Sequence, residues 1–506
     1  MPNEIELKLR IAKADVPRLR RHPALKQHLL AKPLTRKLVS IYYDTPDLKL
    51  LDAAISLRVR SMSGGWFQAV KAAGHSLGGL HQRHEWEDLL SKGEPDFDKI
   101  IEPHLAEIFA SPGLRAALKP MFITNVARTE WQLEYEDGSQ IEVALDLGEL
   151  QVGKEKAPIQ EVELELKHGK AIHLFELALA LQADIPLHIE NISKAQYGYA
   201  YFRPSPPRVS LAHTPELKAK TSVQEAALII IRECLRHLQS NQEMVLHGTD
   251  AEGVHQMHIA MRRLRSALKL FKLKAAFLSN ELDWISLLLG TARDWDVLLN
   301  ETLPAALHQL APNESHFMLQ AHATSTQKQA QQALKQALTS QRYQRLLLSL
   351  GAWLETESAI ESNSNSVKKI GKFAKNNLNK SYEKLQASGK TLHDLNKRQL
   401  HKVRIKAKNL RYALEFFVQA LESKESGDHL PAFIAKLALV QKSLGLRNDI
   451  AITEQLMAQL MLQSRDADLN DAISVLNLWN QSRLAKTDKL VRRSWRAFRQ
   501  ARPCWD

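Results

Sequence analysis

Apolar and charged residues alternate strictly in several short segments of the N-terminal part of the chain. In EIELKLR, which spans Glu4 to Arg10, each charged residue up to Lys8 is followed by an apolar one. A period of two residues predicts a β-strand with one apolar face and one charged face. The same alternation occurs in SLRVR, WFQAVK, HQRHEWE, IEVALDLGE and EVELEL. These segments predict an antiparallel sheet.

The charged faces of these strands carry almost only carboxylates and Arg or Lys. For any one segment, a sheet face exposed to water is the simpler interpretation. Taken together, the segments favour a barrel whose lumen is lined with charge and whose outside is covered by helices such as Lys170–Gln182. Confined charges must be paired or neutralised by ligand and metal. Carboxylates suit Mg²⁺ or Mn²⁺, and Arg and Lys suit phosphate oxygens, so we predict binding of a metal–polyphosphate complex.

An ordered set of motifs carries a family resemblance. EIELK, YYDT, LRVR, Lys71, GGLHQRHEWE, ALDLG, EVELEL and ISKAQYGY follow one another along residues 1–203. In content and order they resemble the triphosphate tunnel metalloenzymes, the CYTH superfamily, and most closely its bacterial inorganic triphosphatases that carry a second domain. The resemblance implies an eight-stranded antiparallel β tunnel with flanking helices, in which a divalent metal, Mg²⁺ or Mn²⁺, assists hydrolysis of a terminal phosphoanhydride.

The resemblance also implies roles for individual residues. The metal would be held, directly or through water, by Glu4, Glu6, Asp146, Glu163 and Glu165. The triphosphate would be bound by Lys8, Arg58, Arg60, Lys71, Arg83, Arg128 and Lys194. Catalysis would involve Glu4, Glu6, Lys8 and Glu85. Two points stay open: Lys8 could instead pair with its neighbouring glutamates, and Glu161 shares the face of Glu163 without a clear reach to the metal.

We therefore expect an enzyme that hydrolyses inorganic tripolyphosphate to diphosphate and phosphate. One alternative is a polyphosphate- or nucleotide-binding protein without catalysis. Another is a triphosphatase acting on thiamine triphosphate or a different organic triphosphate. The abundance of lumen carboxylates favours catalysis, because a sensor of anions needs bases and has little use for acids.

A proline-rich stretch at residues 204–220 divides the chain. The formal net charge is −2 through Arg203 and +15 beyond it, so the basic excess belongs to the C-terminal part. That part is poor in glycine and has the periodicity of helices. We predict an α+β domain at 1–203, a linker at 204–220 and an all-α domain at 221–500.

The C-terminal part contains an internal duplication. VHQMHIAMRRLRSAL (254–268) matches LHKVRIKAKNLRYAL (400–414), and LGTARDWDV (289–297) answers LGLRNDIAI (444–452). Such self-similarity indicates two copies of one helical unit. Basic residues recur at helical spacing in both copies: His255, His258, Arg262, Arg265, Lys269, His401, Arg404, Lys408 and Arg411. For one helix a solvated face would be an equal explanation, but recurrence beside the apolar stripe of both copies favours an anion-binding surface or a cavity between them.

These strings resemble the CHAD domain, a conserved-histidine α-helical domain often fused to tunnel enzymes. The resemblance implies a pair of pseudo-symmetric helical bundles that bind inorganic polyphosphate along the basic residues. Nucleic acid is possible but less favoured as a partner, since the tryptophans do not interleave with the basic positions. No apolar run approaches the roughly 20 residues of a membrane span, and the chain has only two cysteines, so we expect no membrane partner and a cytoplasmic protein.

Overall fold

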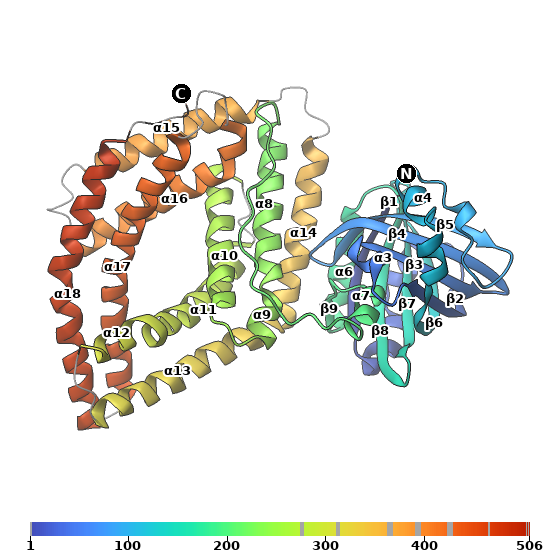
Figure 1. Cartoon of the computed structure of the whole chain (residues 1–506), viewed down its shortest axis with the longest axis horizontal. Coiled ribbons are helices and arrows are strands. Elements are labelled where there is room, and N and C mark those ends of the chain that lie inside the picture. Colours follow the sequence, from blue (N-terminus) through green and yellow to red (C-terminus); the bar gives the residue numbers. More distant parts are fainter. Residues whose placement is uncertain are drawn as a thin grey trace. The chain divides into compact units, whose positions relative to one another are not determined.

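A computed structural model describes residues 3–273, 278–309, 314–361, 368–389, 396–421, 429–463, 466–501, 503 and 505. The chain forms two compact units. The first, here called the tunnel unit, contains the residues up to Pro206 together with Thr339–Thr356. The second, the helical unit, contains Pro207–Leu338 and the residues from Glu357 onward. Each unit is described by itself (Figure 1).

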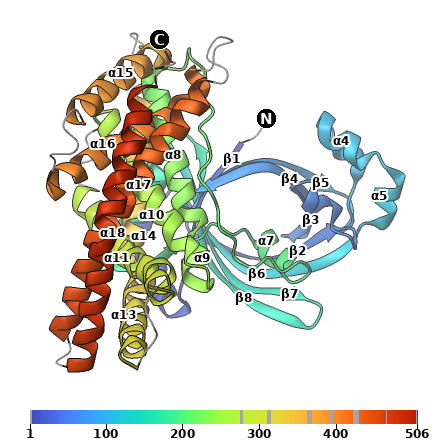
Figure 2. The same ribbon diagram turned by 60° about the vertical axis from the view of Figure 1, so that its left-hand side comes forward.

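Within residues 3–206, which are described without a gap, one antiparallel sheet closes into a barrel. The strands are β1 (Asn3–Ile11), β2 (Leu34–Asp44), β3 (Ile55–Met62), β4 (Gly65–Leu77), β5 (Leu80–Leu90), β6 (Lys119–Glu134), β7 (Gln140–Val152), β8 (Glu155–His168) and β9 (Leu187–Ile189). Their order is β5-β4-β3-β2-β6-β7-β8-β1-β9, and β5 also pairs with β1. That last pairing closes eight strands into a ring (Figure 2), which confirms the predicted tunnel. The short β9 extends β1 outside the ring.

The largest buried cluster of apolar strand residues packs on the outside of the ring, while a smaller one, with Tyr42 and Phe122, lies on the inner face against α7 (Lys194–Ala200). The helices of this unit are α1 (Val16–Arg21), α2 (Ala24–Gln27), α3 (Lys49–Asp52), α4 (Pro103–Phe109), α5 (Pro112–Ala117), α6 (Ile172–Asp184) and α7 (Lys194–Ala200). Leu7, Val143 and Leu164 share one buried cluster with Phe175 and Leu181 of α6, the helix predicted over residues 170–182. Because side chains alternate along a strand, burying the apolar set outside turns the charged set into the lumen.

A segment from far along the sequence also covers the barrel. Helix α14 (Gln341–Glu361) contributes the fully buried Leu348 to the cluster of α6. A Cβ atom added at Gly351 would lie 2.2 Å from Cε1 of Phe175, so only glycine allows this approach. Residues 339–356 thus form part of the tunnel unit although they lie between the two copies of the repeat.

The helical unit contains the two predicted copies. The first contains α8 (Val223–Ser240), α9 (Gln242–His247), α10 (Glu252–Leu270), α11 (Ser279–Val297), α12 (Leu303–Leu307) and α13 (Glu314–Leu338), and the second contains α15 (Ile370–Ser388), α16 (Lys397–Leu421), α17 (His429–Gln463) and α18 (Ala467–Arg499). A short π-helical stretch, Leu298–Thr302, joins α11 to α12.

The two copies stack their helices in the same order. Helices α8, α10, α11 and α13 pack successively in the first copy, as α15, α16, α17 and α18 do in the second (Figure 1). Equivalent helices also meet across the copies, α8 with α15, α10 with α16 and α13 with α18. This arrangement is the predicted pseudo-symmetric pair, and the predicted core residues Met257, Met261 and Leu264 are buried in it.

Residues 204–218 form neither helix nor strand. The domain limits at 203 and 221 stay a prediction, since the compact units are defined by contacts and include 339–356 with the tunnel. A search of the described helices finds none whose apolar stretch could span a lipid bilayer.

The close approach of helix α7 to the barrel wall allows a test of the fold by substitution of Gly198. A Cβ atom at Gly198 would lie 2.3 Å from the Phe122 ring, which itself stacks on Tyr42. We expect Gly198→Ala to lower the free energy of unfolding of the tunnel unit by about 1–3 kcal/mol, because the ring must move. Calorimetry of the full chain measures this. Gly113→Ala, on the exposed face of α5, is the matched control and should stabilise by up to about 1 kcal/mol.

Candidate functional site

The barrel encloses a cavity of about 700 Å³. Its wall includes all but one of the residues to which the sequence analysis gave a metal-binding, substrate-binding or catalytic role: Glu4, Glu6, Lys8, Arg58, Arg60, Lys71, Arg83, Glu85, Arg128, Glu163, Glu165 and Lys194. The exception, Asp146, is fully buried directly behind Arg128 and Lys194. The structure therefore brings together residues from strands β1, β3, β4, β5, β6, β7 and β8 and from α7. Their individual roles stay predictions.

One set of charges, here called the Lys71 group, comprises Lys71, Glu4, Glu85, Arg58 and Arg83. The Lys71 ammonium donates to both carboxylate oxygens of Glu4, at 2.7 and 2.6 Å, and lies 3.0 Å from Glu85. Glu85 in turn accepts from Arg58 at 2.9 Å. Although burial raises the pKa of Glu85, the nearby Lys71 and Arg58 bring it down to about 2. Glu85 thus stays ionised and holds the Lys71 ammonium and the Arg58 guanidinium in place.

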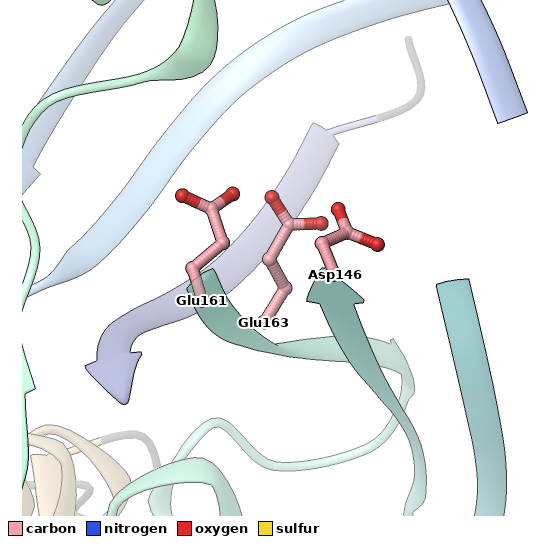
Figure 3. Close-up of side chains that lie close together, drawn as sticks. All are labelled: Asp146, Glu161 and Glu163. Atoms are coloured by element: carbon pink, nitrogen blue, oxygen red, sulfur yellow. The ribbon is translucent and has the colours of Figure 1, made fainter. Parts of the chain in front are cut away.

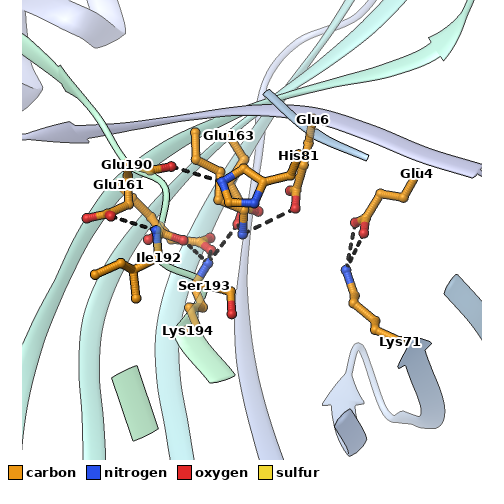
Figure 4. A network of polar contacts seen from close by, with 12 residues as sticks. Glu4, Glu6, Lys71, His81, Glu161, Glu163, Glu190, Ile192, Ser193 and Lys194 are labelled. Carbon is orange, nitrogen blue, oxygen red and sulfur yellow. Dashed lines mark hydrogen bonds and ion pairs between the residues drawn. The ribbon is translucent and has the colours of Figure 1, made fainter. Parts of the chain in front are cut away.

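A second set, the Lys194 group, comprises Lys194, Asp146, Glu161, Glu163 and Arg128. Arg128 makes a bidentate pair with Asp146, with two bonds of 2.7 Å, and also donates to Glu163. Lys194 lies 2.7 Å from Asp146 and 3.0 Å from Glu163, and donates to Glu161 (Figure 4).

Lys8 of β1 joins this group, because its ammonium lies 2.8 Å from Glu163 and 3.3 Å from Glu6. The alternative role considered for Lys8, an ion pair with a neighbouring glutamate, therefore exists in the structure beside its place in the lumen wall.

Asp146, Glu161 and Glu163 form the one carboxylate cluster found among the described residues that could hold a metal ion. Each offers an oxygen, and these oxygens lie within 4.8 Å of one another (Figure 3). All three side chains are buried, and burial raises the pKa of Glu161. An all-oxygen, charged donor set fits a hard divalent cation. The site thus suits such a metal, which would compete with Lys194 for these oxygens.

The structure does not bring the five carboxylates that were predicted to bind metal into one cluster. Of the five, only Asp146 and Glu163 belong to this cluster, and Glu161, whose reach was left open, completes it. Glu6 accepts from Arg83 at 2.7 Å, and Glu4 is held by Lys71. Glu165 pairs with Lys167 at 2.7 Å.

Arg60 differs from the other lumen cations, because within residues 3–206 no carboxylate lies within 4 Å of its guanidinium. It donates to Ser40 Oγ at 3.1 Å. Burial, together with repulsion from Arg58 and Arg128, lowers the pKa of Arg60 to about 10. A buried cation that is repelled by its neighbours is stabilised by an incoming anion.

The cavity also contains residues that were not assigned roles from the sequence. The polar ones are Arg36, Tyr42, Ser56, Glu87, Glu130, Gln132, Glu142, Lys167 and Ser193. Arg36 lies in LTRKLV, where no strict alternation reveals a lumen face. Glu87 and Glu142 share the charged faces of their strands, so the periodicity was the available signal for them.

The helical unit has a cavity of its own, of about 680 Å³. Six of the nine predicted basic residues line it: His255, His258, Arg262, His401, Arg404 and Lys408. Equivalent positions of the two copies therefore face one space, which is the second of the two arrangements, a surface or a cavity, considered from the sequence. The cavity also contains Arg293, Arg447, Asp294, Asp449 and Glu301.

Three basic side chains in this cavity have no carboxylate within 4 Å among the described residues: Arg262, Arg404 and Lys408. Burial, followed by repulsion from Arg262, Arg404 and Arg411, lowers the pKa of Lys408 to about 6. Burial likewise lowers the pKa of His258 to about 3. Such a site favours an anion that would restore these charges.

The structure does not bring the other three predicted residues into the cavity. Arg265 is exposed and pairs with Asp283, and Arg411 lies 3.1 Å from Glu415. Lys269 is exposed near the end of α10.

The sequence matches two known protein families, one in the N-terminal and one in the C-terminal part. The CYTH domain family matches residues 2–199, and the CHAD domain family matches residues 229–458. The chain therefore belongs to the CYTH family in its N-terminal part and to the CHAD family in its C-terminal part.

Individual relatives cover parts of the chain. An inorganic triphosphatase of Haemophilus influenzae is 32% identical over 200 residues, which are 39% of this chain and 55% of that protein. An uncharacterized protein of Mycobacterium tuberculosis is 27% identical over 260 residues, 48% of this chain and 49% of its own. The chain thus spans about half the length of these relatives. The crystal structure of the CHAD domain from the plant Ricinus communis is 31% identical, with a TM-score of 0.51 over 57% of this chain and 97% of that one.

The contrast between paired and unpaired lumen arginines can be tested by stability. Arg128→Met leaves Asp146 and Glu163 with less compensation, so it should lower the free energy of unfolding by about 3–5 kcal/mol. Arg60→Met should leave the free energy of unfolding unchanged or raise it, because the pKa of Arg60 is lowered and its charge therefore opposes folding at neutral pH. Calorimetry at pH 7 compares the two. Equal losses would contradict the assignment of Arg60 as the unpaired cation.

Proposed function

We propose that the tunnel hydrolyses inorganic tripolyphosphate to diphosphate and phosphate with the aid of Mg²⁺ or Mn²⁺. One observation carries the proposal: a buried cluster of three carboxylates reaches the tunnel cavity through Glu163, and Arg and Lys side chains line the same cavity. A metal–polyphosphate complex satisfies both kinds of charge at once, whereas an anion alone would face the acids. Membership of the CYTH family and the name of the Haemophilus influenzae relative support triphosphate hydrolysis.

In this proposal the cations of the wall bind the phosphate chain. Arg58, Lys71 and Arg83 exchange their carboxylate partners, in whole or in part, for phosphoryl oxygens. Arg60, which has no such partner to release, supplies the first attraction for the anion. These fixed charges also stabilise the negative charge on the phosphoryl oxygens as the terminal P–O–P bond breaks. The leaving diphosphate takes the electron pair of that bond, and the oxygen of water forms the new P–O bond.

Asp146, Glu161 and Glu163 would hold the divalent ion in the tunnel. When bound, such an ion neutralises phosphate charge and lowers the pKa of a coordinated water. Until such an ion binds, the Lys194 ammonium contacts all three carboxylates and offsets the repulsion between them. Glu6 and Glu4 face the same cavity and can orient water or accept its proton.

The decisive assay measures phosphate release from inorganic tripolyphosphate with Mg²⁺ or Mn²⁺. Glu163→Gln removes a charged donor of the cluster and should lower kcat/KM on the order of a hundredfold or more. ATP and thiamine triphosphate, added as competitors and tested as substrates, rank the inorganic against the organic chain. The exposed Glu155→Gln, on the same strand, is the matched control.

Either main outcome decides the question. Metal-dependent release that collapses in Glu163→Gln but persists in Glu155→Gln supports the enzyme. A folded wild type that binds tripolyphosphate without releasing phosphate would identify a binding protein instead.

We further propose that the cavity of the helical unit binds inorganic polyphosphate. The support is the group of three basic side chains without a carboxylate partner among the described residues, Arg262, Arg404 and Lys408, which two copies of the repeat place around one space. Phosphate oxygens would remove the repulsion that now lowers the pKa of Lys408. Nucleic acid carries the same phosphate charge, so direct competition between the two polymers separates them.

This proposal predicts that the helical unit takes up a proton when it binds the anion. The pKa of Lys408 is about 6 in the free cavity, so at pH 7.5 its amine is mostly neutral; a phosphate beside it raises the pKa and the amine gains a proton. Calorimetric titration with polyphosphate in buffers of different ionisation enthalpy measures the uptake, which we expect to reach about one proton per site.

Lys408→Arg is the matched variant, since arginine stays protonated in both states. It should bind polyphosphate while the proton uptake falls by about the contribution of Lys408. Uptake that is unchanged in Lys408→Arg would contradict the assignment.

A further inference from the structure

Lys194 contacts every member of the carboxylate cluster, and its position depends on how α7 begins. It is the first residue of α7, a short helix whose N-cap is Ser193. Ser193 Oγ accepts from the backbone N–H of Gln196 at 3.2 Å, and Gln196 Oε1 accepts from that of Ser193 at 2.8 Å. This capping box fixes where α7 begins, and therefore where the Lys194 side chain enters the tunnel.

Glu190 ties the approach to α7 to two strands of the barrel. Its backbone N–H donates to the carbonyl of Lys8 on β1 at 2.9 Å, and its carbonyl accepts from Nε2 of His81 on β5 at 2.9 Å. Its carboxylate accepts from the backbone N–H of Ile192 at 2.8 Å and from the hydroxyl of Tyr197 at 2.7 Å. Glu190 is only 4% exposed, and Figure 4 shows it in one network with His81, Ile192 and Lys194.

The strand that precedes Glu190 is held by α14. One edge of β9 pairs with β1. At its other edge, the N–H of Leu187 donates to Oε1 of Gln341 at 3.2 Å, and the N–H of Ile189 donates to Oε1 of Gln344 at 2.9 Å. The two glutamines stand three residues apart on one face of a helix, and the two N–H groups stand two residues apart on one side of a strand. Gln344 is buried, so its bond to Ile189 is sheltered from water.

We propose that Glu190 is a positioning residue for Lys194, and that Gln344 of α14 supports it through β9. Five residues of chain lead from Ile189 to Lys194, and Glu190 and Ser193 bond most of the backbone between them. A segment that lies between the two helical repeats thereby helps to set the geometry of the carboxylate cluster in the tunnel. The proposal rests on the proposed function only for its effect on catalysis.

The test is a double-mutant cycle in the full chain. Glu190→Leu and Gln344→Leu should each raise the Kd for inorganic tripolyphosphate with Mg²⁺ and lower kcat/KM. We expect changes of about tenfold for Glu190→Leu and severalfold for Gln344→Leu. Lys194→Met removes the positioned group itself. In the Lys194→Met background, the two leucine substitutions should cause almost no further loss. Full multiplication of the effects would overturn the proposal, because a general structural defect does not depend on Lys194.

Glu190→Gln provides the conservative rescue. Its amide oxygen can still accept from Ile192, and its amide group can donate to the Tyr197 oxygen. The pair with Arg10, at 3.2 Å in the wild type, is lost, but the Arg10 side chain is largely exposed, so we expect nearly wild-type values. A loss as large as that of Glu190→Leu would mean that charge, rather than support of α7, is what matters. Gln151→Leu, at an exposed position of β7, is the matched glutamine control and should change nothing.

Hydrogen–deuterium exchange over residues 190–200 measures how firmly α7 and the residues before it are held, and it does not require catalytic turnover. Exchange should be faster in Glu190→Leu and Gln344→Leu and unchanged in Gln151→Leu. A wild type that releases no phosphate would refute the proposed function but leave this result intact. Unchanged exchange in both leucine variants would overturn the positioning proposal whatever the activity.

Discussion

The structure depends on one constraint: the apolar faces of the barrel strands are buried on the outside. Leu7, Val143 and Leu164 pack against α6 on that side. On the inner face a smaller apolar cluster, which includes Tyr42 and Phe122, packs against Tyr199 of α7, and the rest of that face carries charged residues that water can no longer fully solvate. Such residues must pair with one another or with a ligand, and the structure shows them paired in two groups around Lys71 and Lys194.

This pairing is suited to exchange with a ligand. In the proposed function, the clustered carboxylates Asp146, Glu161 and Glu163 would exchange Lys194 for a metal ion, and the cations of the wall would turn to phosphate oxygens. The buried pairs therefore keep the barrel stable without its ligand, while Arg60 and the cations of the helical cavity lack carboxylate partners among the described residues. The two units reach a similar electrostatic solution from unrelated folds, one by closing a sheet and the other by duplicating a helical unit.

The duplication explains which basic residues meet and which do not. Residues 255, 258 and 262 of α10 and their counterparts in α16 line one cavity. Arg265 and Lys269 continue the same stripe, but each residue adds 1.5 Å along a helix, so Lys269 lies about 10 Å beyond Arg262. The periodicity was sufficient to predict the face of the helix. The length of the cavity depends on helices that come from elsewhere in the chain.

The sequence by itself determined the elements and their faces. Alternation of period two defined the strands of EIELKLR and EVELEL, and the 146-residue offset of the repeat defined the helical copies. Local periodicity contains this information because it depends only on neighbouring residues. The tertiary structure decided which charges meet. Glu161 faces Asp146 because of the register between β7 and β8, and that register is not encoded in either strand alone. The addition of α14 to the tunnel unit likewise depends on packing between segments more than 150 residues apart, such as Phe175 and Gly351, which no local pattern records.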